Sequence, residues 1–153
     1  MRSLPTGVSI LAASDAHGRP VGLTVNAVAS VSLRPPILLV CIHQRARMRS
    51  LLRVGMPLVV NVLSSGQADL ARRFASSTED RFAGVAHQVR RSGHVMITGA
   101  VAHVLCSVRE IVEVGDHSVV FADVTGGDAH DGSPLVFCEQ GYTAAGGVRQ
   151  ASD

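Results

Sequence analysis

Short runs of apolar, largely β-branched residues, each bounded by turn residues, are the feature that most constrains this chain. Val8 to Ser14 and Val21 to Val28 flank a polar segment that contains Gly and Pro, which predicts a β-hairpin. Two further strands are expected at Ile37 to Ile42 and at Leu58 to Leu63. Because strands mostly follow strands, this order argues against a βαβ fold.

The later part of the chain predicts a second, longer hairpin. A strand from about Gly99 to Val114 and one from His117 to Thr125 meet at Gly115-Asp116, where a Gly in the first central position suits a type II′ turn. A last strand is expected at Pro134 to Cys138. Gly141 to Asp153 is expected to be a tail that is frayed from about residue 143.

Two short helices are expected between the strands. One covers Arg45 to Val54, and the other runs from a cap at Ser64 or Ser65 to about Ala75. Residues 76–93 are polar and weakly periodic, so a long surface connection is expected there. Residues 1–153 therefore predict one mainly β (α+β) domain, with a barrel-like sheet of six to seven strands and two short inserted helices.

The composition excludes several classes of function. All fourteen Lys or Arg residues are Arg, so a Schiff-base lysine and a P-loop lysine are impossible. Four Phe, one Tyr and no Trp are too few rings for a base-stacking surface, and the net charge is only +2, so we expect no nucleic-acid partner. The charged fraction of 17% is below the roughly 25% usual in soluble domains. This deficit indicates that another subunit covers apolar surface, most simply in a homodimer.

The cysteines and the apolar segments bear on the cellular compartment. Cys41, Cys106 and Cys138 are odd in number and far apart, which favours reduced thiols. No segment approaches the ~20 apolar residues that span a bilayer, and the apolar run Val8 to Ala13 is too short for a signal peptide. We therefore expect a cytoplasmic protein without a membrane partner.

Small polar side chains along the expected strand Val21 to Val28 form the first candidate site. Thr24 and Asn26 share one face because side chains alternate along a strand, and Ser30 and Ser32 continue the same parity. Such a row lets a flat polar ligand approach the backbone and accept or donate hydrogen bonds. An amphipathic strand with its polar face in water would show the same pattern.

Arginines at the start of the first expected helix form the second candidate site. Arg45, Arg49 and Arg53 are spaced four residues apart, and Arg47 and Ser50 three apart. Guanidinium groups, a hydroxyl and the free N–H groups of a helix start together can bind a phosphate. No acidic residue lies in this segment, so the alternatives are a solvated basic face or ion pairs between subunits.

His117 is the third candidate, because it follows Gly115-Asp116 at the mouth of the long hairpin. An imidazole there can donate a hydrogen bond to a ligand or move a proton, although an ordinary surface histidine would look the same. The chain has no H-E-x-x-H, C-x-x-C or paired-His spacing, so no metal site is predicted. It also has neither a G-x-S-x-G elbow nor a G-x-G-x-x-G loop.

Seven short motifs follow one another along the chain. They are Pro5-Thr6-Gly7-Val8, Pro20-Val21-Gly22-Leu23-Thr24-Val25-Asn26, Ser30-Val31-Ser32-Leu33-Arg34-Pro35-Pro36, Asn61-Val62-Leu63, Ala71-Arg72-Arg73-Phe74, Asp80-Arg81-Phe82-Ala83-Gly84 and Gly115-Asp116-His117. In this order the chain resembles the flavin reductase-like family, which includes the reductase components of two-component flavin-dependent monooxygenases. The resemblance runs from about Pro5 to Tyr142.

The resemblance implies a homodimeric FMN-binding split barrel that uses NADH or NADPH to reduce FMN or FAD. It also assigns roles by position in the motifs. The segment along the isoalloxazine ring is matched by Thr24, Val25, Asn26 and Ala27, and the stretch at the ribityl and phosphate groups is matched by Ser30, Val31 and Ser32. Arg47 and Ser50 resemble the region that holds the phosphate, and Phe82 resembles an aromatic residue near the flavin. Tyr142 resembles the end of the nicotinamide pocket, and His117 resembles the histidine that faces the nicotinamide.

The implied activity is hydride transfer from the reduced nicotinamide to the flavin, which would supply reduced flavin to a partner monooxygenase. His117 would orient the nicotinamide rather than act as an obligatory base. Two other functions stay open at this point. One is a non-enzymatic flavin- or haem-binding split-barrel protein, and the other is an FMN oxidase similar to pyridoxine phosphate oxidase.

Overall fold

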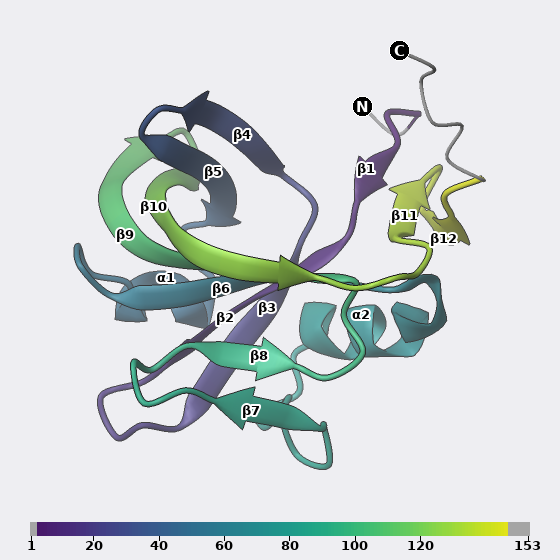
Figure 1. The fold of residues 1–153 in the computed structure, drawn as a ribbon, viewed down its shortest axis with the longest axis horizontal. Coiled ribbons are helices and arrows are strands. Elements are labelled where there is room, and N and C mark those ends of the chain that lie inside the picture. Colours follow the sequence, from purple (N-terminus) through teal and green to yellow (C-terminus); the bar gives the residue numbers. More distant parts are fainter. Residues whose placement is uncertain (1–2, 147–153) are drawn as a thin grey trace.

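A computed structural model describes residues 3–146 and has a seven-stranded antiparallel sheet at its centre (Figure 1). In spatial order, its strands are β3 (Pro20–Val25), β2 (Ser9–Ser14), β6 (Pro57–Val62), β9 (Ala102–Val114), β10 (His117–Ala129), β5 (Pro36–His43) and β4 (Val28–Leu33). The half formed by β9, β10, β5 and β4 curls strongly, as Figure 1 shows, which gives the split β-barrel.

Two small sheets and two helices complete the fold. One sheet has the order β1 (Thr6–Gly7), β11 (Leu135–Cys138), β12 (Gly141–Ala144), and the other pairs β7 (His87–Val89) with β8 (Val95–Ile97). The helices are α1 (Arg47–Leu51) and α2 (Ala68–Ala75), the latter entered through the 3₁₀ turn η1 (Ser65–Gln67). Within residues 3–146, no helix is long and apolar enough to cross a membrane.

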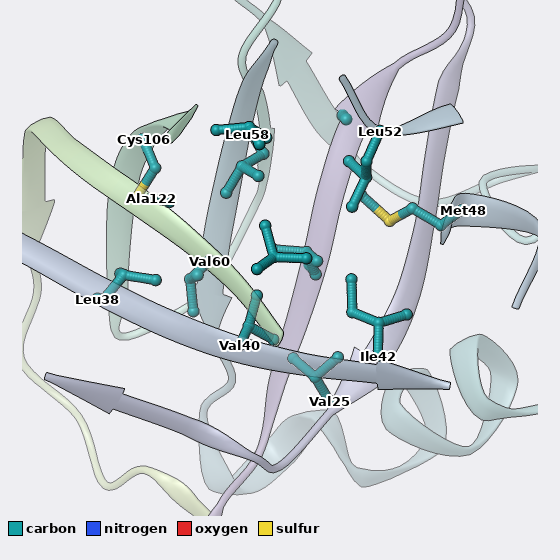
Figure 2. Close-up of a cluster of buried hydrophobic side chains, with 14 residues drawn as sticks. Val25, Leu38, Val40, Ile42, Met48, Leu52, Leu58, Val60, Cys106 and Ala122 are labelled. Carbon is teal, nitrogen blue, oxygen red and sulfur yellow. The ribbon is translucent and has the colours of Figure 1, made fainter. Parts of the chain in front are cut away.

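Two buried clusters lie on opposite faces of β2. The larger one fills the barrel, and Figure 2 shows Val25, Val40, Ile42 and Val60 converging there. The second lies between the other face and α2, where Phe74 is fully buried. Since β2 is buried on both faces, its sequence is a nearly continuous apolar run rather than an alternating one.

Both predicted hairpins are confirmed. β2 pairs with β3, and β9 pairs with β10 across a turn in which Gly115 has φ of 59°. The second helix is also confirmed, and it starts after Ser64, whose N–H donates to Gln67 Oε1 at 3.0 Å. The expected strands at Ile37 to Ile42 and at Leu58 to Leu63 correspond to β5 and β6.

Two expected elements are shorter than predicted. The strand expected at Val21 to Val28 ends at Val25, because Asn26 and Ala27 cross toward β5, where Cys41 N donates to Ala27 O at 2.9 Å. The helix expected at Arg45 to Val54 is only α1, because its flanking residues Ala46 and Leu52 have extended backbones.

Two regions predicted to be irregular contain strands. The expected connection 76–93 includes β7, whose three residues pair with β8. The expected tail includes β12, which pairs with β11, so Thr143 and Ala144 are not frayed. Residues 147–153 of that tail lie outside the described part of the chain.

Asn61 on β6 joins three strands from inside the protein. It is fully buried, its Nδ2 donates to Ile10 O at 3.1 Å and Val95 O at 3.3 Å, and its Oδ1 accepts from Ile97 N at 2.8 Å. The short β8 is thereby fastened to β2 and β6.

Replacing Asn61 should destabilise the fold more than replacing the chain's exposed asparagine, Asn26. Asn61→Ala leaves three buried backbone groups without partners, and we expect a loss of about 2–4 kcal/mol in unfolding free energy, measured by urea denaturation. Asn26→Ala serves as the matched control and should cost less than ~1 kcal/mol. Equal losses in the two variants would contradict this role of Asn61.

Candidate functional site

Three predicted residues from distant parts of the chain line one small pocket. Thr24, Asn26 and Tyr142 surround about 170 Å³ together with Val8 and Phe137. The Tyr142 ring packs on Phe137 at 5.4 Å between centroids, and β12 carries it there by pairing with β11. The resemblance assigns Thr24 and Asn26 to the flavin ring and Tyr142 to the nicotinamide pocket, and the structure brings the three residues to one pocket.

The polar groups of this pocket are partly engaged by the protein. Thr24 Oγ1 donates to Ala71 O at 2.7 Å, which leaves its lone pairs free to accept, and Asn26 Nδ2 donates to Thr6 Oγ1 at 3.2 Å. The guanidinium of Arg72 lies over the Tyr142 ring at 5.3 Å. The pocket therefore offers acceptors, an amide and a ring with a cation on its face.

Val25 and Ala27 can meet a ligand in different ways. The Val25 side chain is 5% exposed and belongs to the barrel core, as Figure 2 shows, so it has only its backbone to offer. Ala27 is exposed, and its carbonyl accepts the bond from Cys41 N. A role along a flat ring would thus depend on the backbone of this segment.

The single polar face expected from Thr24 to Ser32 is wrong. The chain leaves the sheet at Asn26 and Ala27, and β4 then pairs Ser30 with Leu38 but Ser32 with Ile37, which leaves a bulge at Val31. A bulge reverses the parity of the residues on either side. Val31 is half-exposed, and Ser32 Oγ accepts from Arg34 N at 3.2 Å, so these residues form a separate edge.

Arg47 and Phe82 line a larger cleft of about 970 Å³, next to Gly22 and the 77–83 segment. Arg81 also lines it, held by bonds from its guanidinium to Gly22 O at 2.9 Å and Ser76 O at 2.5 Å. Burial, and then the charge of Arg47, lower the pKa of Arg81. Two guanidinium groups that repel each other across a cleft favour an anionic ligand there.

Phe82 and Ser50 contribute less than predicted. Phe82 is only 6% exposed and packs edge-on against Phe74 at 4.8 Å and His87 at 5.0 Å, so most of its ring belongs to the core. Ser50 Oγ donates to Arg47 O at 2.8 Å within α1. The Ser50 hydroxyl proton is therefore used by the helix itself.

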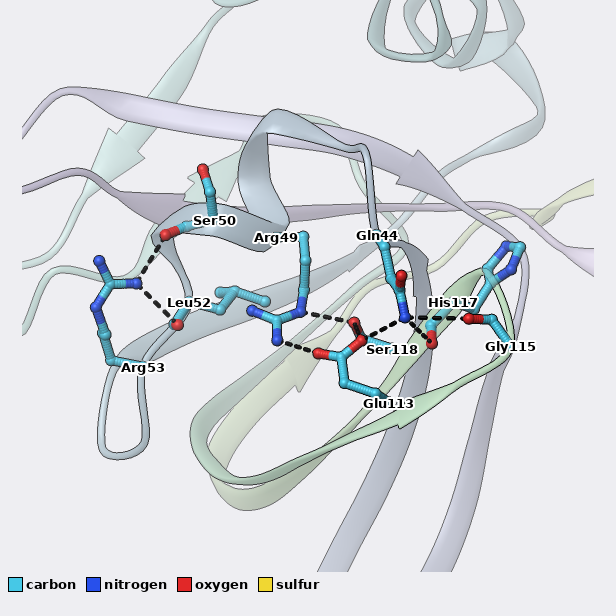
Figure 3. Close-up of polar contacts among 9 residues, drawn as sticks. All are labelled: Gln44, Arg49, Ser50, Leu52, Arg53, Glu113, Gly115, His117 and Ser118. Carbon is cyan, nitrogen blue, oxygen red and sulfur yellow. Dashed lines mark hydrogen bonds and ion pairs between the residues drawn. The ribbon is translucent and has the colours of Figure 1, made fainter.

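A polar network that the sequence did not indicate joins α1 to the β9–β10 hairpin (Figure 3). Arg49 forms an ion pair with Glu113, and Arg49 Nε donates to the buried Ser118 at 2.6 Å. Gln44 Nε2 donates to Glu113 at 2.7 Å and to Gly115 O at 3.1 Å. The acidic partner missing from the helix thus comes from β9, and this intramolecular pair accounts for Arg49.

His117 lies beside this network at the turn. Its Nδ1 is 2.7 Å from Asp116 Oδ1, and its ring meets the His43 ring edge-on at 5.2 Å. His43 is the cross-strand partner of His117 on β5. The bond from His117 lowers the pKa of Asp116, so an ionised carboxylate orients the imidazole.

Most of the predicted residues thus fall into three groups: the Thr24 pocket, the Arg47 cleft and the His117 turn. Ser30, Val31 and Ser32 lie apart from these, on the β4 edge. A model of the flavin reductase-like domain matches residues 1–146 of this sequence. The chain belongs to this family. All three groups include residues of the motifs by which the sequence resembles the flavin reductase-like family, namely the segment of Thr24, the segment of Phe82 and the G-D-H turn.

The relatives of this flavin reductase-like domain include named reductases. The chain is 37% identical over 146 residues to the flavin reductase (NADH) of Kitasatospora aureofaciens, covering 93% of this chain and 76% of that protein. It is 37% identical over 142 residues to the stachydrine N-demethylase reductase subunit of Rhizobium meliloti (strain 1021), covering 93% of this chain. It spans 62% of that subunit and 44% of a second, 38% identical protein of the same organism.

One solved structure to which the chain is similar contains bound ligands. The NADH:FAD oxidoreductase of Streptomyces globisporus, in complex with NAD and FAD fragments, is 30% identical and superposes with a TM-score of 0.86. The superposition covers 99% of this chain and 90% of the Streptomyces chain.

The Arg49–Glu113 pair predicts a pH-dependent part of the stability. The bond from Arg49, aided by Ser118, holds the pKa of Glu113 below its ordinary value of 4.5, so the carboxylate stabilises the fold above that pH. This contribution is lost as the pH falls through the lowered folded value. Glu113→Gln should therefore be less stable than the wild type at neutral pH in urea denaturation, and the difference should shrink in acid.

Glu110→Gln is the matched control, because Glu110 is exposed on the same strand. It should follow the wild-type pH profile. A Glu113→Gln difference that stays constant from neutral pH into acid would show that the ion pair is not its source.

Proposed function

We propose that this chain is an NAD(P)H-dependent flavin reductase that passes a hydride from a reduced nicotinamide to FMN or FAD. The observation that carries the proposal is the likeness of nearly the whole chain to a structure complexed with NAD and FAD fragments. The name of the Kitasatospora relative supports the same activity. A bound flavin supplies the hydride-accepting chemistry, and the protein supplies binding and orientation.

The residues present fit an anionic flavin. Arg47 and Arg81 give the 970 Å³ cleft two cations, and within residues 3–146 neither forms an ion pair with an acidic residue. Arg47 would hold a phosphate there. Ser30 and Ser32 do not line this cleft on the same protomer, so they would reach the ligand only from a second copy of the chain. The backbone of Val25 to Ala27 and the side chains of Thr24 and Asn26 would contact the ring edge.

His117 would position the nicotinamide. Because Asp116 holds Nδ1, the Nε2 atom of His117 is left to bond the amide or the ribose of the donor. Hydride transfer to a flavin needs no proton from the enzyme in the same step, so an orienting imidazole is sufficient. Tyr142 would close the end of the nicotinamide pocket.

A second copy of the chain would complete the site. The three groups of residues line separate places on one protomer, and apolar side chains are exposed near them, such as Val31 on β4 and Val114 at the hairpin end. A homodimer that covers these side chains would bring ligand groups from both copies together. Reductase components of monooxygenases among the relatives support a partner oxygenase that consumes the reduced flavin.

The decisive experiment is NAD(P)H consumption, followed by absorbance with added FMN, FAD or riboflavin. We expect turnover with at least one pair, and His117→Ala should raise the KM for the nicotinamide by about fivefold while the flavin KM changes less than twofold. His17→Ala, in the exposed β2–β3 turn, is the control. Absence of turnover with every pair would refute the proposal and favour a flavin or haem carrier, whereas reduction by an organic substrate alone would favour an FMN oxidase.

Arg47→Ala should weaken the binding of FMN more than that of riboflavin, which lacks the phosphate. Loss of one charged hydrogen bond predicts about 1.5–3 kcal/mol, roughly ten- to 150-fold in Kd, measured by flavin fluorescence titration. Arg53→Ala is the matched control, because Arg53 bonds the carbonyls of Ser50 and Leu52. Equal losses for both flavins would exclude Arg47 from the phosphate site.

A further inference from the structure

A cluster of two histidines and an aspartate lies at the end of the β9–β10 hairpin opposite to the His117 turn. His103 on β9 is the cross-strand partner of Asp128 on β10, and His130 follows β10 directly. His103 Nδ1 is 2.6 Å and His130 Nε2 is 3.3 Å from the same atom, Asp128 Oδ1. None of these residues lines the Arg47 cleft or the Thr24 pocket, to which the proposed flavin reductase activity is assigned.

The hydrogen bonds of His103 require a cation in the cluster. Its Nε2 lies 2.9 Å from Ile97 O, and since a carbonyl only accepts, Nε2 carries a proton. In a neutral ring, Nδ1 would then present a lone pair to the carboxylate of Asp128. The side chain of His103 is 7% exposed, so water does not relieve that repulsion. Either a proton or a metal ion must lie between the two groups.

The ligand atoms are placed for a metal ion. Nδ1 of His103, an oxygen of Asp128 and Nε2 of His130 all lie within 4.8 Å of one another. Bonds of about 2.0–2.2 Å to zinc separate tetrahedral ligands by roughly 3.3 Å, which matches the contact between Asp128 and His130. The contact between His103 and Asp128 needs to widen by less than ~1 Å.

The surroundings hold these ligands in place. The bond from His103 Nε2 to Ile97 O is the outer-shell contact that metal-bound imidazoles use to fix the ring. At Gly127 a Cβ would lie 2.4 Å from His103 O, so the two strands approach closely beside the ligands. His130 N donates to Val101 O at 2.7 Å.

Arg90 is the one arginine that forms an ion pair with the cluster within the described part of the chain. Its Nη2 lies 3.8 Å from Asp128 Oδ2, so it faces the second carboxylate oxygen and leaves Oδ1 to the histidines. The Arg90 side chain is half-exposed and can move outward when another positive charge arrives.

We propose that His103 Nδ1, Asp128 Oδ1 and His130 Nε2 bind a divalent ion of the zinc class, with a fourth position open to water. Two imidazoles and one carboxylate favour zinc over magnesium or calcium, which prefer all-oxygen sites. The ion links β9 to β10 and, through Ile97 O, to β8. It therefore acts as a structural clamp at this end of the barrel, independent of the flavin reductase activity.

The test is thermal unfolding of chelator-treated protein with and without added Zn²⁺. Saturating Zn²⁺ should raise the Tm by about 5–10 °C in the wild type, and His130→Gln should abolish the rise. His130 is exposed, so this variant should still fold. Co²⁺ should give the visible absorption bands of a tetrahedral site in the wild type and lose them in His130→Gln.

His17→Gln is the control, since His17 is an exposed histidine outside the cluster, and it should keep the full response to Zn²⁺. A Tm that does not respond to Zn²⁺, or that responds equally in His130→Gln, would overturn the proposal. The wild-type Tm could instead be unaffected by Zn²⁺ and rise as the pH is lowered through the range in which histidine titrates. That result would show that a proton, and not a metal ion, lies between His103 and Asp128.

Discussion

The pairing of β9 with β10 is the interaction on which the rest of the structure depends. β6 pairs with the free edge of β9 and β5 with the free edge of β10, so both halves of the main sheet are built on this hairpin. Its register shifts twice, at Phe121/Ala122 and at Val124/Gly126. Such bulges bend and twist a pair of strands, which allows the sheet to curl around the buried side chains shown in Figure 2.

The same hairpin has a polar group of residues at each end. At its turn, Arg49 of α1 donates a hydrogen bond to Ser118 and forms an ion pair with Glu113, and His117 lies beside them (Figure 3). At its open end, His103 faces Asp128. Apolar side chains such as Val108 and Val120 fill the stretch between these ends, so the two polar groups are separated by core.

The parts of the fold that could be predicted are those that depend on local patterns. Gly115-Asp116 between two long apolar runs predicts the central hairpin, and Ser64 predicts the start of α2. β7 and β12 escaped prediction because each has only three or four residues and depends on a partner strand. The bulge at Val31 is likewise set by pairing with β5, and no pattern in the sequence marks it.

The residues of the candidate site likewise divide into those set by local sequence patterns and those set by contacts between distant segments. The turn of His117 and the small polar side chains of β3 are visible in the sequence because each belongs to one element. The pair of Arg49 with Glu113 joins residues 64 positions apart, and that of His103 with Asp128 joins residues 25 apart. Spacing rules for helices and metal motifs do not reach across such distances. The packing of α1 against the hairpin brings Arg49 to Glu113, and the register of β9 with β10 brings His103 to Asp128.

The small sheet of β1, β11 and β12 bears on how the molecule is assembled during synthesis. Thr6 pairs with Phe137, and Gly7 pairs with Val136, so β1 can pair only after β11, much later in the described chain, has been synthesised. The β2–β3 hairpin can form soon after it leaves the ribosome, since its contacts are local. Phe137 and Tyr142 line the pocket of Thr24 only after β11 and β12 have been synthesised. A nascent chain therefore gains this pocket later than the β2–β3 hairpin, and a ligand that needs the pocket can stabilise the protein only from that point.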